Sequence, residues 1–181
     1  SGSTTQQTYI VYVPDSVKKN YSATKPAPVL FCTHGAGQTA FVFMEATDIK
    51  DAAERHGFIA VTYDTPTTAD LTDLVPPVKQ DCFGLGVAAD ETRLYVYGQS
   101  AGGGAVTNFA RDAALVNTFA AFGHTSGTYS NPAATSSTAL LPLYVIYGEY
   151  DYWPMKFGAV AAGEWRGSTG QSGSTASMQN Y

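Results

Sequence analysis

The chain has 181 residues, of which 44% are hydrophobic, 13% are aromatic and only 14% are charged, and its formal net charge is −5. This length and apolar content predict one domain, residues 1–181, with a sizeable core. Scattered acids and a negative net charge argue against binding to nucleic acid or to an anionic membrane surface. No apolar run approaches the roughly 20 residues of a membrane span.

Short apolar runs alternate with helical patterns, which favours βαβ units and a mainly parallel sheet. Residues 8–13 alternate like an edge strand, and residues 29–33 are typical of a buried strand. A helical stripe follows over residues 43–55, and Gly57 is expected to end this helix. Residues 58–63 predict the next strand.

The second half of the chain continues the same alternation. Residues 65–90 have a weak pattern interrupted by prolines, which predicts at most a short helix before the next strand. The remaining expected elements are a strand over residues 94–97, a helix over 105–115, and strands over 119–122 and 143–147.

Cysteine content and composition bear on the compartment. Cys32 lies inside an apolar run, where a small buried hydrophobe is the default interpretation, and a disulfide to Cys82 is the alternative. Low charge, abundant Gly, Ser, Thr and Tyr, and the sequon at Asn20 lean toward secretion, with any signal peptide already removed. We therefore expect a secreted protein.

The first chemical motif is at residues 98–102, which read Gly-Gln-Ser-Ala-Gly. A bare Gly-x-Ser-x-Gly match is common in chains rich in Gly and Ser, but here it follows a predicted strand and precedes a predicted helix. Flanking glycines let the chain turn sharply and hold the serine hydroxyl above the carboxyl end of the strand. This context predicts that Ser100 is a nucleophile.

The second motif is the loop at residues 34–39, which follows a central strand. The backbone N–H groups of Ala36 and Ala101 would converge on the oxygen that becomes negative when a carbonyl is attacked. The alternative is a tight glycine turn at a strand end. Asp151 follows a later strand and is the candidate triad acid. The alternatives are that Glu149 is this acid, or that Asp151 is an acidic residue of a surface turn without a catalytic role.

With these motifs in this order, the sequence resembles the α/β-hydrolase superfamily, and within it the secreted polyhydroxybutyrate-depolymerase-like esterases, which include feruloyl and acetylxylan esterases. The matching segments are residues 8–14, 34–39, 93–103 and 148–151, within a resemblance that runs from about residue 8 to 165. The resemblance implies a mainly parallel central sheet flanked by helices. It also implies ester hydrolysis through an acyl-enzyme, with Ser100 as nucleophile, Asp151 as acid, and Ala36 and Ala101 as oxyanion donors. Candidate substrates are small or polymeric esters, plant cell-wall polysaccharide included.

The chain departs from the family pattern at the general base. In the family a histidine follows the acid after a helix and one more strand, but no histidine follows Asp151, and no apolar run beyond Trp153 is typical of that last strand. The last strand is therefore expected to be missing, either because the chain is cut short or because further residues follow it. His34 is expected to support the oxyanion loop, and His56 to cap a helix C-terminus. His124 follows the predicted strand 119–122 and is either a base in an unusual chain order or a histidine satisfied by loop carbonyls. A residue outside this chain is the other candidate base.

A second hypothesis is a catalytically impaired hydrolase scaffold that acts as a binding module. Tyr150, Tyr152 and Trp153 could stack on an aromatic or carbohydrate ligand, although rim packing explains them equally well. A peptidase or a lipase on the same fold ranks lower, because no lid or propeller segment is evident. Neither a cofactor nor a metal is expected, since the clusters lack ligand spacing and the glycine run at 102–104 lacks the rest of a nucleotide fingerprint.

Overall fold

The computed structural model describes residues 8–64, 68–110, 112, 114–127 and 142–146. Within this part of the chain, one six-stranded sheet has the order β1-β3-β2-β4-β5-β6. The strands are β1 Tyr9–Tyr12, β2 Ala27–Thr33, β3 Ile59–Tyr63, β4 Ala89–Gln99, β5 Ala121–Thr125 and β6 Leu143–Ile146. The expected α/β class with a mainly parallel sheet is confirmed.

Strand direction follows the sequence pattern. β1, whose run alternates, pairs antiparallel with β3 at one edge, as predicted for residues 8–13. The other neighbouring strands pair in parallel. Every residue of β3 is buried, because a parallel sheet covered by helices on both faces excludes water from its central strands.

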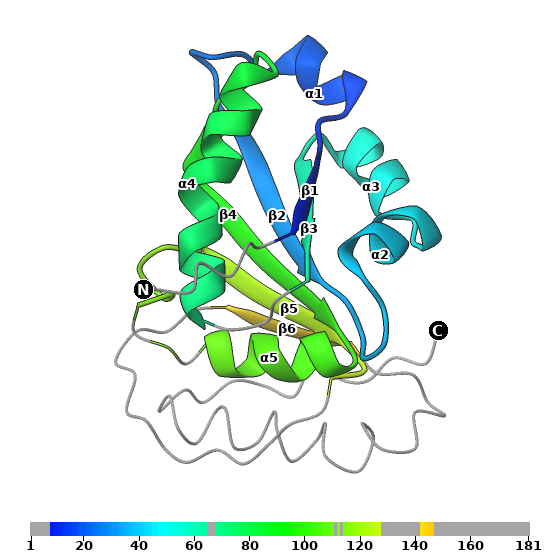
Figure 1. The fold of residues 1–181 in the computed structure, drawn as a ribbon. Helices are drawn as coiled ribbons and strands as arrows, with labels where there is room; N and C mark the ends of the chain where they lie inside the picture. Colours follow the sequence, from blue (N-terminus) through cyan, green and yellow to red (C-terminus); the bar gives the residue numbers. More distant parts are fainter. Residues whose placement is uncertain (1–7, 65–67, 111, 113, 128–141, 147–181) are drawn as a thin grey trace, which may run out of the picture.

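Helices cover both faces of this sheet. The helices are α1 Asp15–Asn20, α2 Ala40–Ala46, α3 Ile49–His56, α4 Thr68–Gly84 and α5 Ala101–Phe109. Figure 1 shows α4 and α5 on one side of the sheet and α2 and α3 on the other. The alternation of strand side chains divides the core accordingly: Val61 packs with the residues of α4 and α5, and Ala60 packs with those of α2 and α3.

The single helix expected over residues 43–55 is two helices, so this prediction was wrong at its centre. Thr47 has extended backbone angles, φ −112° and ψ 161°, and its hydroxyl donates to the carbonyl of Phe43 at 2.7 Å. This local hydrogen bond competes with the continuing helix, and α3 restarts after Asp48. Gly57 ends α3 in the left-handed conformation, φ 71°, as expected.

Three other boundaries differ from the prediction. α4 is 17 residues long and contains both prolines, because tertiary packing of its buried leucines outweighs their cost. α5 begins at Ala101 and ends at Phe109, both earlier than expected. The strand expected at residues 119–122 is β5, which begins two residues later in the chain. Phe119 precedes this strand, and its ring packs edge-on against that of Phe31, with 5.6 Å between the ring centroids.

The cysteines are both buried and free, so the alternative disulfide is not formed. Cys82 packs in the same cluster as Phe31, and successive strand residues point to opposite faces, so Cys32 and Cys82 lie on opposite faces of the sheet. Among the helices that the structure describes, none has the length and apolar character needed to cross a membrane.

Candidate active site

The candidate site lies where the strand order reverses. From β2 the chain forms β3 on one side, and then β4 on the other side of β2. In an open parallel sheet, ligands bind beyond the carboxyl ends of the strands at such a switch point. His34 directly follows β2 and Ser100 directly follows β4, so the two sequence motifs meet at this point.

Ser100 occupies the turn between β4 and α5 in a strained conformation. Its φ is 53° and its ψ is −116°, a combination that side chains with a β-carbon rarely adopt. Its N–H donates to the carbonyl of Thr125 at 2.9 Å, which fixes the turn to β5. The side chain is exposed. An exposed serine on a strained turn between strand and helix has the geometry of a nucleophile elbow.

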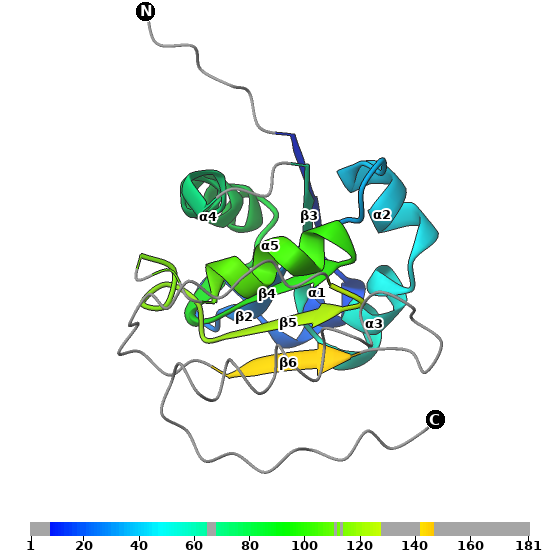
Figure 2. The same ribbon diagram turned by 90° about the horizontal axis from the view of Figure 1, so that it is seen from below.

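The glycines of the motif are required by close backbone approach. A β-carbon at Gly98 would lie 2.3 Å from the carbonyl oxygen of Gly102, and one at Gly102 would lie 2.6 Å from the carbonyl oxygen of His34. α5 therefore begins directly on the backbone of β4 and against the end of β2. Seen from below, α5 lies across β4 and β5 (Figure 2).

The loop after β2 lies beside the serine. A β-carbon at Gly35 would be 3.3 Å from Cβ of Ser100 and 3.8 Å from its Oγ. Ala36 follows Gly35 in an exposed turn, and Ala101 is the exposed first residue of α5. The first N–H groups of a helix have no intrahelical acceptor and carry the positive end of its dipole. The neighbourhood of Ser100 thus contains both backbone segments that an oxyanion hole needs.

Both ring nitrogens of His34 lie at hydrogen-bond distance from an oxygen. Its Nδ1 lies 2.8 Å from the carbonyl oxygen of Gly35, and its Nε2 lies 3.2 Å from Oδ1 of Asp64. The same carboxylate oxygen accepts from the backbone N–H of Ala40. His34 therefore supports the loop through hydrogen bonds, as the sequence predicted. Asp64 was not predicted, and its only signal is an acid directly after the strand at residues 58–63.

His124 lies within β5, and its side chain is buried. It pairs with Gly98 in register, and residues paired between parallel strands point to the same face, which here is the face covered by α5. A β-carbon at Gly103 would lie 3.1 Å from Cβ of His124. Burial lowers the pKa of His124 to about 4. An efficient general base has a pKa near the working pH, so this environment disfavours that role for His124.

The remaining predicted residues are His56 and the acidic and aromatic residues near position 150. His56 ends α3 in an exposed position, in keeping with a helix C-terminal cap. Asp151 and Glu149 lie outside the described residues, as do the three aromatic residues at 150, 152 and 153. Among the described residues, no group of three or more His, Cys, Asp and Glu side chains is arranged to hold a metal ion.

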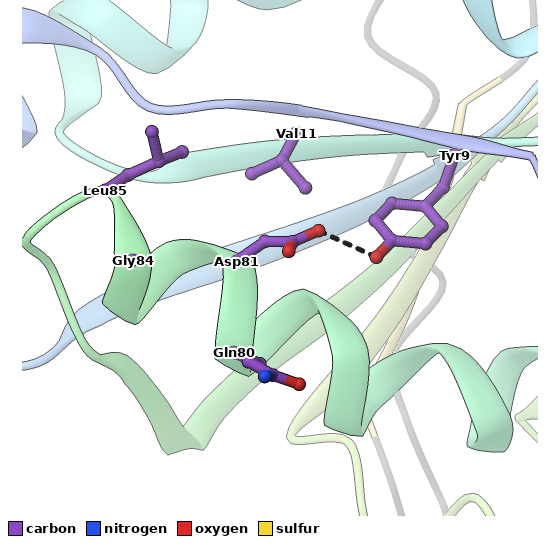
Figure 3. A pocket seen from close by; sticks show the side chains of 6 residues that line it. All are labelled: Tyr9, Val11, Gln80, Asp81, Gly84 and Leu85. Atoms are coloured by element: carbon purple, nitrogen blue, oxygen red, sulfur yellow. Dashed lines mark hydrogen bonds between the residues drawn. The ribbon is translucent and has the colours of Figure 1, made fainter.

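A separate surface hollow of about 580 Å³ lies between β1 and the C-terminal half of α4 (Figure 3). In Figure 3 the hydroxyl of Tyr9 points toward Asp81, and it donates to the Asp81 carboxylate at 2.7 Å. Burial, together with this hydrogen bond, raises the pKa of Tyr9 to about 12. The hollow is lined by residues of β1 and α4 and by Leu85, which directly follows α4, and it contains none of the candidate catalytic residues.

The sheet, its helices and the serine turn define an α/β-hydrolase fold, and solved structures of this fold are similar to the chain. A ferulic acid esterase is 26% identical with a TM-score of 0.54, and the match covers 75% of this chain and 60% of that one. An S-formylglutathione hydrolase from Agrobacterium tumefaciens is 16% identical with a TM-score of 0.65, covering 88% and 76%. An acetyl xylan esterase from Aspergillus awamori is 20% identical with a TM-score of 0.51, covering 70% and 54%.

The chain therefore spans 60% of the length of the ferulic acid esterase. No protein-family model matches the sequence, and comparison with curated proteins gives no match. These structural neighbours are esterases and hydrolases of the α/β-hydrolase type.

Proposed function

We propose that the protein is a secreted serine carboxylic ester hydrolase of the feruloyl, acetylxylan or polyhydroxybutyrate-depolymerase-like type, acting through an acyl-enzyme on Ser100. The observation that carries this proposal is the exposed Ser100 at φ 53°, beside the Gly35 backbone at the switch point of the sheet. The neighbours named as ferulic acid esterase and acetyl xylan esterase support the same chemistry.

In the proposed reaction, Oγ of Ser100 attacks the ester carbonyl carbon as a general base takes its proton. The carbonyl oxygen becomes negative, and the N–H groups of Ala36 and Ala101 donate to it. The tetrahedral intermediate then expels the alcohol, which takes up the proton, and leaves an acyl-serine. A water molecule releases the acid by the same steps and restores Ser100. Asp151 is proposed to orient and stabilise the protonated base.

The substrate class rests on the neighbours and on the composition. Esters of plant cell-wall polysaccharide or of other polymers suit a secreted enzyme of this kind, and the sequon at Asn20 with low charge supports secretion. Two apolar side chains, Phe41 and Val42, are 64% and 43% exposed on α2 directly after the loop. They offer an apolar surface to an aromatic acyl group on the helix that follows the candidate loop.

The test is hydrolysis of p-nitrophenyl acetate and methyl ferulate, together with labelling by a fluorophosphonate. The whole protein, with its general base, should turn over both esters and become labelled at Ser100, and Ser100→Ala should lose labelling and about a millionfold in kcat. Thr24→Ala is a matched control, because it removes an exposed hydroxyl just before β2, at the opposite end of that strand from the candidate site. Labelling that persists in Ser100→Ala would refute the assignment.

The general base has two proposed sources, His124 and a residue outside the 181-residue chain. His124→Gln separates them. If His124 is the base, this variant loses turnover as completely as Ser100→Ala does. If the base is a residue outside the 181 residues, these residues alone turn over esters only at a residual rate with or without His124, and His124→Gln in the whole protein changes turnover little, which is the outcome that the burial and low pKa of His124 favour.

The positions of the two histidines nearest the site favour the binding-module alternative, because neither is placed as a general base for Ser100. His34 is engaged by Gly35 and Asp64, and His124 lies under α5. A parent chain that binds an aromatic or carbohydrate ligand without turning over esters, and that keeps this binding in Ser100→Ala, would be such a scaffold.

A further inference from the structure

We propose that Asp64 is a positioning residue for the candidate oxyanion loop, holding both ends of residues 34–40 through one carboxylate oxygen. This inference rests on the proposed function, because it assigns a purpose to the loop beside Ser100. Asp64 is not a catalytic residue in this proposal. It acts on the reaction only through the backbone that carries the N–H of Ala36.

The position of Asp64 follows from the strand order. It is the first residue after β3, and β3 lies beside β2, with Tyr63 paired to Thr33. The loop therefore leaves β2 next to the point where Asp64 leaves β3. The N–H of Asp64 donates to the carbonyl of Thr8 at 3.2 Å, which ties this backbone to the start of β1. The carboxylate is thus mounted on a fixed strand end.

The two bonds reach opposite ends of the loop. Nε2 of His34, at the first loop residue, lies 3.2 Å from Oδ1 of Asp64. The backbone N–H of Ala40, at the start of α2, donates to the same oxygen. Nδ1 of His34 also faces an acceptor, the carbonyl of Gly35 at 2.8 Å. Hydrogen bonds that involve ionised partners are about twice as strong as neutral ones.

The residues between these ends depend on them. Residues 36–39 are exposed and form a turn in which the N–H of Gln38 donates to the carbonyl of Gly35 at 3.3 Å. At the far end, the carbonyl of Ala40 accepts from the hydroxyl of Thr62 at 2.9 Å. Ala40 is therefore fixed through its N–H by Asp64 and through its carbonyl by Thr62. Without the carboxylate, His34 and the N–H of Ala40 lose their shared anchor.

Loss of this anchor should affect the transition state more than substrate binding. The Gly35 backbone is in close contact with Ser100, so the next N–H, that of Ala36, must keep its place to within a fraction of an ångström. Donors of an oxyanion hole act on charge that develops in the transition state, and a misplacement of about 1 Å can cost about a hundredfold in rate. We expect kcat to fall while KM stays nearly constant.

The experiment compares Asp64→Ala and Asp64→Asn in the whole protein, with p-nitrophenyl acetate as substrate and active sites counted by fluorophosphonate titration. Asp64→Ala should lower kcat about 10- to 100-fold with KM within about threefold. Asp64→Asn should recover much of this loss, because its amide oxygen can accept both bonds. Asp90→Ala is the matched control: Asp90 also accepts a backbone N–H, from Thr92 at 2.9 Å, near the start of β4, and its kcat should stay at the parent value.

Amide hydrogen exchange provides a second measurement, in which the Ala40 amide should lose protection in Asp64→Ala and keep it in Asp90→Ala. If Asp64→Ala does not fold, Asp64→Ser is read in the same assays, since its hydroxyl is too short to reach both donors. A parental kcat in the substituted chain overturns the inference and leaves the proposed function standing. A whole protein that neither turns over esters nor labels at Ser100 overturns the proposed function, and the inference falls with it.

Discussion

At the scale of single residues, the backbone of Ser100 links stability to the proposed chemistry. Its positive φ costs of order 1–3 kcal/mol for a residue with a β-carbon. The hydrogen bond to Thr125 and the close packing of the motif glycines keep the residue there. The folded chain therefore bears strain at the one side chain whose hydroxyl is proposed to react.

This strain makes a prediction for two substitutions that both remove the hydroxyl. Ser100→Gly should be more stable than Ser100→Ala by about 1 kcal/mol, because relief of the positive φ exceeds the extra unfolded-state entropy of glycine. Urea unfolding measures the free energies of unfolding of the two variants. Equal stabilities would show that the turn is not strained.

His124 predicts how stability depends on pH. Its pKa is lowered from 6.5 to about 4 by burial, so the unfolded chain binds more protons than the folded chain between these two values. The contribution of His124 to the free energy of unfolding is therefore fully present above about pH 6.5. As the pH falls toward 4, the free energy of unfolding decreases by about 3 kcal/mol. His124→Gln should flatten the dependence of the unfolding free energy on pH in this window. An unchanged slope would contradict the buried neutral imidazole.

At the scale of elements, the sequence predicted strands better than helices. Buried runs such as residues 29–33 are strand signals on their own, because parallel strands between two helical layers are continuously apolar. The break at Thr47 depends on a local hydrogen bond that hydrophobic periodicity does not register. α4 was underestimated because its prolines are local signals, whereas Leu71, Leu74 and Val78 are held by the core.

The contact between α1 and α3 carries a prediction of its own. No side chain at the N-cap position of α1 accepts a hydrogen bond from its first turn, and Glu54 of α3 instead accepts from the N–H groups of Asp15 at 2.8 Å and Ser16 at 3.1 Å. The backbone bonds, led by that of Ser16, lower the pKa of Glu54. A lowered carboxyl pKa stabilises the fold above the unfolded-state pKa and is lost as pH falls through the folded value.

Glu54→Ala should therefore lower the melting temperature at neutral pH, and its difference from the parent should vanish in acid. Thermal unfolding followed by circular dichroism across the acid range measures this. Glu45→Ala is the matched control, since Glu45 is an exposed acid that accepts a hydrogen bond from the Lys50 side chain. A difference from the parent that is constant with pH would rule out the carboxylate as the cap.

At the scale of the whole molecule, the candidate site is assembled from segments that are distant in the chain. Its pairing of residues 34–39 with Ser100 was predictable, because carboxyl ends of parallel strands meet at one edge of a sheet. The contribution of Asp64 was not, because it depends on β3 lying beside β2, and the sequence alone does not specify that order. His124 was expected after its strand, but a shift of β5 places it inside the sheet, under α5.

The two cysteines report on the integrity of the whole fold. Both are free and buried, and burial raises the pKa of both thiols, that of Cys82 to about 11. The native chain should therefore not react with a thiol reagent such as Ellman's reagent at pH 8, and the two thiols should react fully in guanidinium chloride. Fewer than two reactive thiols in the unfolded, unreduced chain would instead indicate a disulfide.

The glycine contacts between α5 and the sheet have a consequence for how this protein can vary. Because the nearest atoms at Gly98 and Gly102 are backbone carbonyl oxygens, a compensating side-chain substitution cannot make room there. The exposed Phe41 and Val42 on α2 have no such constraint. In a library of random mutants selected for new ester preferences, we expect accepted changes to accumulate on α2 and to be absent from the two glycines.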